Sequence, residues 1–228
     1  MLRYVFLATI SLLAAATSLQ AQPASPPTAS SPAVESPNSP ESMADPQMGD
    51  HWTYEVRDDI TGDVKSTTTY TITDVSSTDI GVRFAILGNA NYGYQTFDHS
   101  WNLTNNGIWR YSPNDGTGIR LPLAAEKSWA IKGSDLNTTA GFGWKRTGTS
   151  KVIAQESITT RAGTFDTFKI ETFLQFQAVN DPTKKYTGVL QTWYAPAIDH
   201  WVKRAYVSRF DGRVRDKNTI ELVEYGRR

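Results

Sequence analysis

The sequence predicts an all-β protein built as a single curved meander of about eleven antiparallel strands. Two observations predict this class. Glycine, proline, asparagine and aspartate separate short runs that are rich in β-branched and aromatic residues. One of these runs also alternates between apolar and polar side chains, which is typical of a strand with one buried face. Only two short stretches favour a helical turn or two, Leu121–Lys127 and Ala195–His200.

The N-terminal residues 1–21 have the pattern of a secretory signal peptide. Arg3 supplies the positive charge, and the apolar run Tyr4–Ala16 follows it. This run is shorter than the roughly 20 residues that cross a bilayer, which argues against the alternative of a membrane anchor. We therefore expect cleavage after Ala21, a periplasmic or secreted protein, and no stable membrane insertion afterwards.

Residues 22–44 are expected to form a disordered tether. They contain six Pro and six Ser in 23 positions and no aromatic residue. Such a segment buries too little apolar surface to offset the entropy of ordering, and its prolines favour extended conformations. The folded domain is then residues 45–228, which hold all seven Trp.

Within this domain, Val64–Val75 shows most clearly why strands are predicted. Its threonines lose rotamer freedom in a helix but suit a pleated surface. The expected strands, in order, are His51–Asp58, Val64–Val75, Ile80–Leu87, Tyr94–Trp101, Ile108–Ser112, Phe142–Thr149, Lys151–Thr160, Phe165–Ala178, Tyr186–Tyr194, Trp201–Phe210 and Thr219–Tyr225.

Turn residues indicate how successive strands connect. Asp211-Gly212 is a strong signal for a two-residue hairpin, because both positions tolerate positive φ. Asp181-Pro182 opens another turn, and Arg161-Ala162-Gly163 precedes the run with strict alternation. In that run Phe168, Ile170, Leu174 and Phe176 share one face, and Lys169, Glu171, Gln175 and Gln177 share the other.

Composition excludes several classes of function. Lys+Arg 23 equals Asp+Glu 23, which argues against a general nucleic-acid binder. Without cysteine the chain has no disulfide, no thiol chemistry and no Cys-ligated zinc. The sequence also lacks a phosphate-binding glycine loop. We expect no cofactor and no metal.

Catalytic patterns are weak. His51, His99 and His200 are far apart in sequence and form no metal-binding pair, so strand-end histidines are favoured over a site. In Asp98-His99-Ser100, neighbouring side chains on a strand point to opposite faces and cannot form a relay. An envelope hydrolase stays the third alternative, and it requires His99 or His200 to converge with carboxylates.

Aromatic residues carry the most functional information, with Trp 7, Tyr 10 and Phe 9. They either fill the space under a curved sheet, line a groove for an apolar ligand, or stack on sugars. The candidate lining residues are Trp52, Tyr54, Trp109, Trp193, Tyr194 and Trp201.

The C-terminal residues 201–228 hold eight bases against four acids. This local charge favours either a solvated hairpin or the docking of an anionic partner, with Arg213 and Arg215 as candidates.

Several segments resemble a family of bacterial envelope proteins called TapB-like. They are Gly49-Asp-His-Trp-Thr-Tyr54, Leu121-Pro-Leu with Lys127-Ser-Trp129, Arg161-Ala-Gly-Thr-Phe-Asp-Thr-Phe-Lys-Ile170, Thr192-Trp-Tyr-Ala-Pro196 with Trp201-Val-Lys-Arg204, and Glu221-Leu-Val-Glu-Tyr225. The resemblance implies a curved antiparallel sheet or half-barrel with an apolar concave face, akin to the lipoprotein carriers of the Lol system. It implies no catalytic residues. The sequence departs from the carriers in lacking the helices that plug their cavity.

The leading hypothesis is a secreted, non-enzymatic β-sheet protein that binds an apolar, lipid-like molecule on its aromatic concave face. The alternative is an interaction or structural module that docks onto an envelope protein through a strand edge or the basic C-terminal hairpin.

Overall fold

The computed structural model describes residues 42–227, which lie within one compact unit. The predicted signal peptide and the tether up to residue 41 fall outside the described residues. Met43 belongs to the predicted tether, yet it is fully buried and donates its backbone N–H to the Ala197 carbonyl at 2.8 Å. Packing therefore begins two residues before the predicted start of the domain. None of the described helices is long and apolar enough to cross a membrane.

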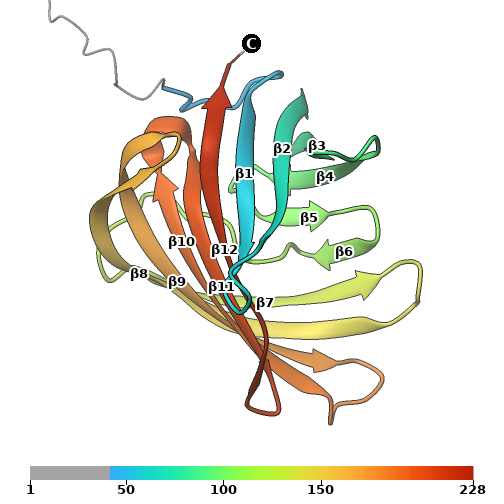
Figure 1. Ribbon diagram of the computed structural model, residues 1–228. Helices are drawn as coiled ribbons and strands as arrows, with labels where there is room; N and C mark the ends of the chain where they lie inside the picture. Colours follow the sequence, from blue (N-terminus) through green and yellow to red (C-terminus); the bar gives the residue numbers. More distant parts are fainter. Residues whose placement is uncertain (1–41, 228) are drawn as a thin grey trace, which may run out of the picture. The chain divides into compact units, whose positions relative to one another are not determined.

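The described chain is all-β, as predicted, and it forms twelve antiparallel strands with one 3-10 turn (Figure 1). The elements are β1 (His51–Asp58), β2 (Val64–Val75), β3 (Asp79–Ile86), β4 (Tyr92–Asp98), β5 (Leu103–Asn105), β6 (Trp109–Ser112), β7 (Ser128–Asn137), β8 (Gly143–Thr160), β9 (Gly163–Ala178), β10 (Lys185–Ala195), η1 (Pro196–Ile198), β11 (His200–Phe210) and β12 (Arg213–Gly226).

The sheet closes on itself, so the predicted open half-barrel is wrong. Strand β1 pairs with β2 on one side, where Tyr54 faces Thr68, and with β12 on the other, where Tyr54 faces Leu222. All other neighbours are consecutive along the chain, which gives a closed meander. Closure removes the two free sheet edges that an open meander leaves.

The predicted elements were close to the observed ones, with four differences, one of which is that β12 begins at Arg213, six residues before its predicted start. Strands β1 and β2 have the predicted bounds, and Asp211 and Gly212 form the predicted hairpin turn with φ of 48° and 72°. Strands β5 and β7 were missed, and residues 143–160 form one strand where two were expected. Residues 121–127 are not helical, whereas η1 supplies the short turn expected near residue 196.

Buried polar residues explain why β7 was missed. On its inward side the strand carries Trp129 and Ile131, but then Asp135 and Asn137, which are also buried. The apolar alternation therefore stops halfway along a strand whose burial alternation continues.

Two groups of buried side chains form the core. The first contains Trp52, Tyr54, Trp101 and Trp201 with the apolar residues around them. The second contains Trp129, Ile170, Leu174 and Phe176, so the predicted alternation of β9 is confirmed.

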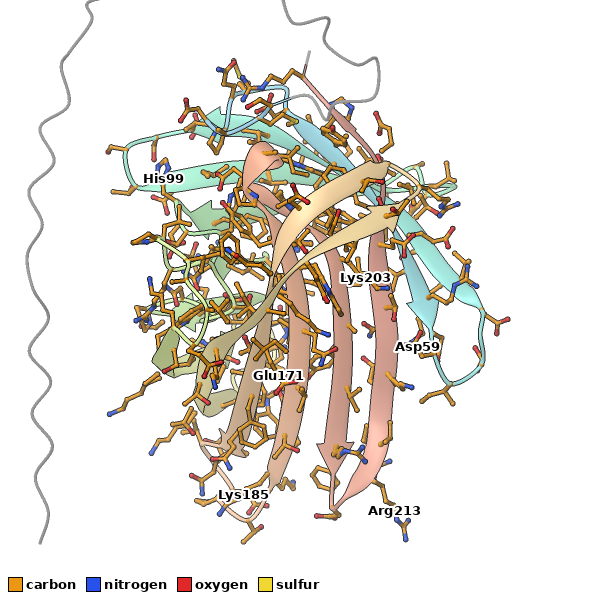
Figure 2. All side chains as sticks on the ribbon, turned by 90° about the vertical axis from the view of Figure 1, so that its left-hand side faces the viewer. Asp59, His99, Glu171, Lys185, Lys203 and Arg213 are labelled. Atoms are coloured by element: carbon orange, nitrogen blue, oxygen red, sulfur yellow. The ribbon has the colours of Figure 1, made fainter. Side chains whose placement is uncertain are left out.

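Strands β8 and β9 are the longest of the barrel, and their hairpin extends past their neighbours. Strand β9 pairs with β10 only from Phe168, opposite Tyr194, onward. The preceding part of the hairpin, residues Ile153–Phe168, crosses the outer faces of β10, β11 and β12 (Figure 2). We call this segment the flap. Phe165 packs on Tyr225 of β12, and Arg161 forms an ion pair with Glu55 of β1 at 2.6 Å.

Candidate ligand-binding site

The barrel interior beside Trp52 is filled by the protein's own rings. Trp52 stacks on His200 with centroids 4.3 Å apart and meets the edge of Trp101 at 5.5 Å. The free volume among these rings is about 10 Å³, and its lining residues are Trp52, Tyr70, Val82, Phe97, Trp101, His200 and Trp201. That volume holds at most one water molecule. In this arrangement Trp52 is a core residue.

Buried hydrogen bonds hold Tyr54 and His200 together. The Tyr54 hydroxyl donates to the Trp201 carbonyl oxygen at 2.7 Å and lies 2.7 Å from His200 Nδ1. Because the hydroxyl has a single proton, Nδ1 of His200 must donate to the Tyr54 oxygen. Burial, followed by the positive charge of Arg204, lowers the pKa of His200 well below its ordinary value. His200 is therefore neutral and structural.

Next to these rings, Arg204 of β11 is half-buried and directs its guanidinium toward the barrel interior. Its Cζ lies 3.6 Å from the centroid of the Trp201 ring. Nη2 donates to the Thr117 carbonyl oxygen at 3.3 Å, and Nε is buried with no hydrogen-bond partner among residues 42–227. Burial lowers the pKa of Arg204 to about 10, so the group is still charged at neutral pH.

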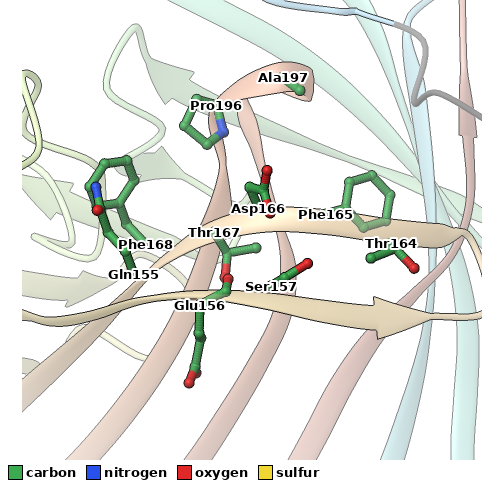
Figure 3. Close-up of a pocket in the computed structure, with 10 residues that line it drawn as sticks. All are labelled: Gln155, Glu156, Ser157, Thr164, Phe165, Asp166, Thr167, Phe168, Pro196 and Ala197. Carbon is green, nitrogen blue, oxygen red and sulfur yellow. The ribbon is translucent and has the colours of Figure 1, made fainter.

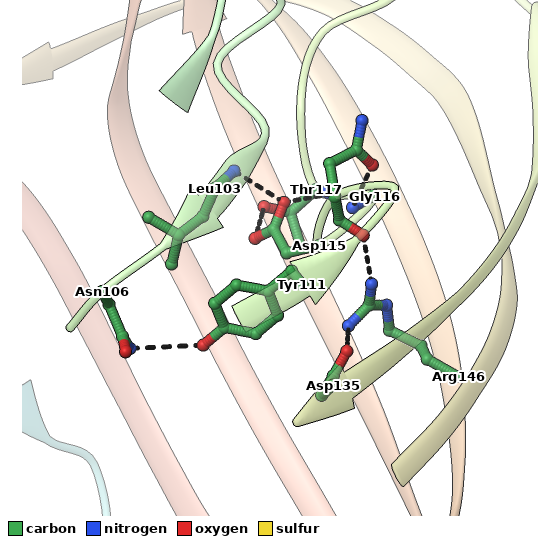
Figure 4. A network of polar contacts seen from close by, with 9 residues as sticks. Leu103, Asn106, Tyr111, Asp115, Gly116, Thr117, Asp135 and Arg146 are labelled. Carbon is green, nitrogen blue, oxygen red and sulfur yellow. Dashed lines mark hydrogen bonds and ion pairs between the residues drawn. The ribbon is translucent and has the colours of Figure 1, made fainter. Parts of the chain in front are cut away.

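No carboxylate of the described chain forms an ion pair with Arg204. Asp115 is the acid that attracts it over a longer distance. The Asp115 carboxylate instead accepts hydrogen bonds from the backbone N–H of Leu103 at 2.9 Å and from Thr117 (Figure 4). Burial raises the pKa of Asp115, and the charges of Arg204 and Arg146 act against this rise.

The second inward-pointing arginine, Arg146 of β8, is paired. It forms a buried ion pair with Asp135 of β7 and donates to the Asn114 carbonyl oxygen (Figure 4). Gly133 makes room for it, since a Cβ there would lie 2.8 Å from Arg146 Nη2. The contrast shows that this fold supplies a carboxylate to one interior arginine and not to the other.

Three half-buried tyrosines, Tyr70, Tyr186 and Tyr206, lie on the inner face of the barrel near Arg204 or farther along it. Tyr70 lies 6.0 Å from Tyr54, ring to ring, and Tyr206 follows Arg204 on the same side of β11. The Tyr206 ring lies over Gly188, where a Cβ would be 2.9 Å from its hydroxyl oxygen. Tyr186 stacks on Phe176 at 4.1 Å. Within the described chain the hydroxyls of Tyr70 and Tyr186 have no hydrogen-bond partner, and burial raises the pKa of both.

The six predicted lining residues lie in four separate places. Trp52, Tyr54 and Trp201 surround His200, as described above. Tyr194 belongs to the second core group and donates its hydroxyl to Asp199 at 2.5 Å. Trp193 lies under the flap. Trp109 of β6 is half-buried, and its ring centroid lies 5.4 Å from that of Phe142.

Trp193 anchors the flap to the outside of the barrel. Its Nε1 donates to Glu156 at 2.5 Å, and the ammonium groups of Lys169 and Lys203 lie 4.7 and 5.5 Å from its ring. A groove of about 720 Å³ lies beside it, between the flap and η1 (Figure 3). Its lining residues are Gln155, Glu156, Ser157, Thr164, Phe165, Asp166, Thr167, Phe168, Pro196 and Ala197.

The predicted docking residues Arg213 and Arg215 are exposed near the β11–β12 turn (Figure 2). The guanidinium of Arg215 lies 5.5 Å from the Phe210 ring. Docking through this hairpin stays a prediction.

The three histidines occupy different environments. His51 pairs with Glu224 at 2.8 Å, His99 bonds to the Ser76 carbonyl oxygen at 2.8 Å, and His200 lies in the aromatic core. No group of three or more potential metal-ligating His, Cys, Asp or Glu side chains forms within residues 42–227.

Sequence reasoning missed Arg204 and Tyr70 as site residues. Arg204 counted as one of eight bases in a basic C-terminal stretch and as the end of a segment of the family resemblance, but not as a site residue. The available signal was its parity with Tyr206 on β11, which places both on one face of that strand.

Comparison with known proteins identifies a shared fold. No protein-family model and no curated protein sequence matches the chain. A candidate lipoprotein of Parabacteroides distasonis ATCC 8503 aligns with 82% of this chain and 100% of its own, at 17% identity and a TM-score of 0.52. A candidate exported protein of Bacteroides fragilis NCTC 9343 aligns with 79% of this chain and 97% of its own, at 12% identity and a TM-score of 0.51. The described barrel is therefore similar in fold to these two bacterial proteins, the second of which has a YmcC-like fold.

Proposed function

We propose that this protein is an exported, periplasmic binding protein that holds an amphipathic molecule with a terminal acidic group inside its barrel. Arg204 receives the acidic group in this proposal. Trp201, Tyr54 and Tyr70 form the wall around it. The predicted signal peptide and the fold shared with a candidate lipoprotein and an exported protein support export.

The observation that carries the proposal is the unpaired guanidinium of Arg204. Removing a charge from water is costly unless it is paired and hydrogen-bonded. Arg204 has five N–H donors, and within the described chain only Nη2 has a protein acceptor. A carboxylate or phosphate accepts two parallel hydrogen bonds from such a group, which makes an acidic ligand the natural partner.

The surroundings of Arg204 favour an amphipathic ligand over a small inorganic anion. Aromatic rings form the walls on both sides, with Trp201 under the guanidinium and Tyr70 next to Tyr54. The free hydroxyls of Tyr70 and Tyr186 supply a few hydrogen bonds along an otherwise aromatic surface. Such a combination of apolar walls and few polar groups is typical of small-molecule sites.

The positions of the tyrosines support one placement of the ligand in this proposal. The space among Trp52, Trp101 and His200 is about 10 Å³, so the ligand does not enter that end. Tyr70, which also lines that space, and Tyr206, which follows Arg204 on the same face of β11, are only half-buried. The apolar part of the ligand therefore extends from Arg204 toward Tyr206 and Tyr186.

Fluorescence quenching by 9,10-dibromostearate tests this assignment, because bromine quenches tryptophans near it. We expect quenching by dibromostearate that unbrominated stearate reverses by competition. Arg204→Met should weaken binding at least tenfold, since it removes the charge and keeps the length of the side chain. The matched control is Arg209→Met, which removes an exposed arginine of the same strand.

Two further readouts separate charge from apolar contact. Stearyl alcohol lacks the carboxylate and should bind wild type and Arg204→Met equally. Equal affinity of the Arg204 and Arg209 variants for dibromostearate would show that the proposal is wrong. Native mass spectrometry of the protein purified from a bacterial periplasm, followed by organic extraction, then identifies the natural ligand.

A further inference from the structure

Four hairpin turns lie along one side of the barrel and carry exposed apolar side chains. They connect β3 to β4, β5 to β6, β7 to β8 and β9 to β10, and Figure 1 shows all four on its right-hand side. The exposed apolar residues there are Leu87, Tyr92, Tyr94, Ile108, Leu136, Phe142 and Val179. We call this set of turns the turn rim.

Contacts between neighbouring turns make part of the rim one continuous patch. Thr138 of the β7–β8 turn donates its backbone N–H to the Ile108 carbonyl oxygen at 2.8 Å. Val179 donates in the same way to Gly143 at 2.9 Å. With the Trp109–Phe142 ring contact, three of the four turns are joined.

The apolar side chains of the rim are too exposed to belong to the core. Leu87 is 80% exposed, Ile108 55% and Leu136 49%. Contiguous exposed apolar groups of this kind mark an interaction surface.

The charges of the rim are mostly positive. Its exposed bases are Arg83, Arg110, Lys145, Lys184 and Lys185. Asp181 is the acid of the β9–β10 turn, and it lies 3.6 Å from Lys184. The guanidinium of Arg83 lies 5.8 Å from the Tyr92 ring, so aromatic and basic groups are adjacent at the rim.

From this combination we infer that the turn rim docks onto a lipid bilayer with anionic headgroups. Apolar tips enter the boundary between headgroups and acyl chains, where Tyr and Trp are favoured, and the surrounding Lys and Arg pair with lipid phosphates. Charge complementarity selects this occupant, because the cationic residues surround the apolar tips without an equal number of acids. The inference does not depend on Arg204.

Flotation with vesicles tests the inference on the full secreted protein. The probe is a 3:1 mixture of phosphatidylethanolamine and phosphatidylglycerol at low salt. We expect wild type to float with these vesicles and the triple variant Ile108→Ser/Leu136→Ser/Phe142→Ser to lose at least nine-tenths of that binding. The matched control Met48→Ser/Val75→Ser/Leu121→Ser removes exposed apolar side chains at the opposite end of the barrel and should bind as wild type does.

A second set of variants tests the charges. Lys145→Gln/Lys184→Gln/Lys185→Gln should lower the affinity by roughly fivefold for each charge removed, and added salt should do the same. Lys151→Gln/Arg161→Gln removes two exposed bases that lie far from the β7–β8 turn, Lys151 opposite Ser128 at the start of β7 and Arg161 in the β8–β9 turn, and should change nothing. Thermal unfolding of every variant checks that it is folded.

Failure of wild type to float, or unchanged flotation of the rim variant, overturns the inference. Arg204→Met should float as wild type does. This variant therefore distinguishes a failed docking surface from a failed ligand site.

Discussion

The guanidinium of Arg204 lies over Trp201, with 3.6 Å between Cζ and the ring centroid. At this distance the positive charge meets the negative face of the indole, and the attraction strengthens where water is excluded. The cation–π contact holds the guanidinium in place but uses none of its N–H donors. It therefore orients a cation whose hydrogen-bonding capacity remains available, which is the arrangement that an acidic ligand requires.

This arrangement predicts that Arg204 lowers the stability of the empty protein. Replacing an unpaired interior charge by an apolar side chain of similar length should stabilise the fold, by about 1–3 kcal/mol. The measurement is urea unfolding of wild type and Arg204→Met, both stripped of bound lipid. Arg209→Met serves as the control, with a change within about 0.5 kcal/mol, as is usual for surface positions. A large loss of stability in Arg204→Met would show that the arginine is a structural residue.

The pair Arg146–Asp135 predicts the opposite behaviour. Asp135→Leu leaves a buried guanidinium without its carboxylate and should cost about 3–5 kcal/mol. The double variant Asp135→Leu/Arg146→Met removes both charges and should regain most of that loss. Urea unfolding of both single variants and the double variant gives the coupling free energy. Additive losses would mean that the two side chains are stabilised independently.

Much of the fold could be predicted because most strands and turns are recognisable from the residue types within each short segment. The β-branched run of β2 and the Asp211-Gly212 turn need no tertiary information. Closure could not be predicted, since it depends on the register between β1 and β12, which are more than 150 residues apart. An open and a closed meander have the same alternation and the same turns.

The candidate site was harder to predict than the fold. Aromatic residues were the right signal for the interior, yet Trp52 fills space and Trp193 lies outside the barrel wall. What distinguishes the site is a missing partner for Arg204, and the lack of a partner becomes visible only in three dimensions. Trp201 and Tyr54 were identified from the sequence, but for their rings alone.

Attachment of the flap is predicted to depend on Phe165 more than on Arg161. Phe165 is 2% exposed and packs on Tyr225, whereas the Arg161–Glu55 ion pair lies at the surface. Phe165→Ala should cost on the order of 3 kcal/mol, through lost burial and the cavity left behind. Limited proteolysis should then cut between residues 153 and 168, and Arg161→Ala should leave the flap protected, because exposed ion pairs contribute little. Equal protection of both variants would contradict this order.

The neutral state of His200 predicts a stability that falls in mild acid. Its pKa is lowered by burial and by Arg204, so below about pH 6.5 the unfolded chain binds a proton there that the folded chain does not. The contribution of His200 is thus constant above pH 6.5 and is lost below it, by up to about 1.4 kcal/mol per pH unit. His200→Gln removes the titrating group, so the stability difference between wild type and this variant should shrink between pH 6.5 and 5.

Urea unfolding at several pH values measures that difference. The buried carboxylates are present in both proteins, so their contributions to the free energy of unfolding cancel. His99→Gln, at a surface histidine bonded to the Ser76 backbone, shows whether replacing a histidine produces such a slope by itself. A constant offset between wild type and His200→Gln across this range would mean that the folded protein accepts the proton. In that case the folded protein would contain a charged imidazole close to the charged guanidinium of Arg204. The hydrogen bond from Nδ1 to Tyr54 would then have to offset the repulsion between the two cations.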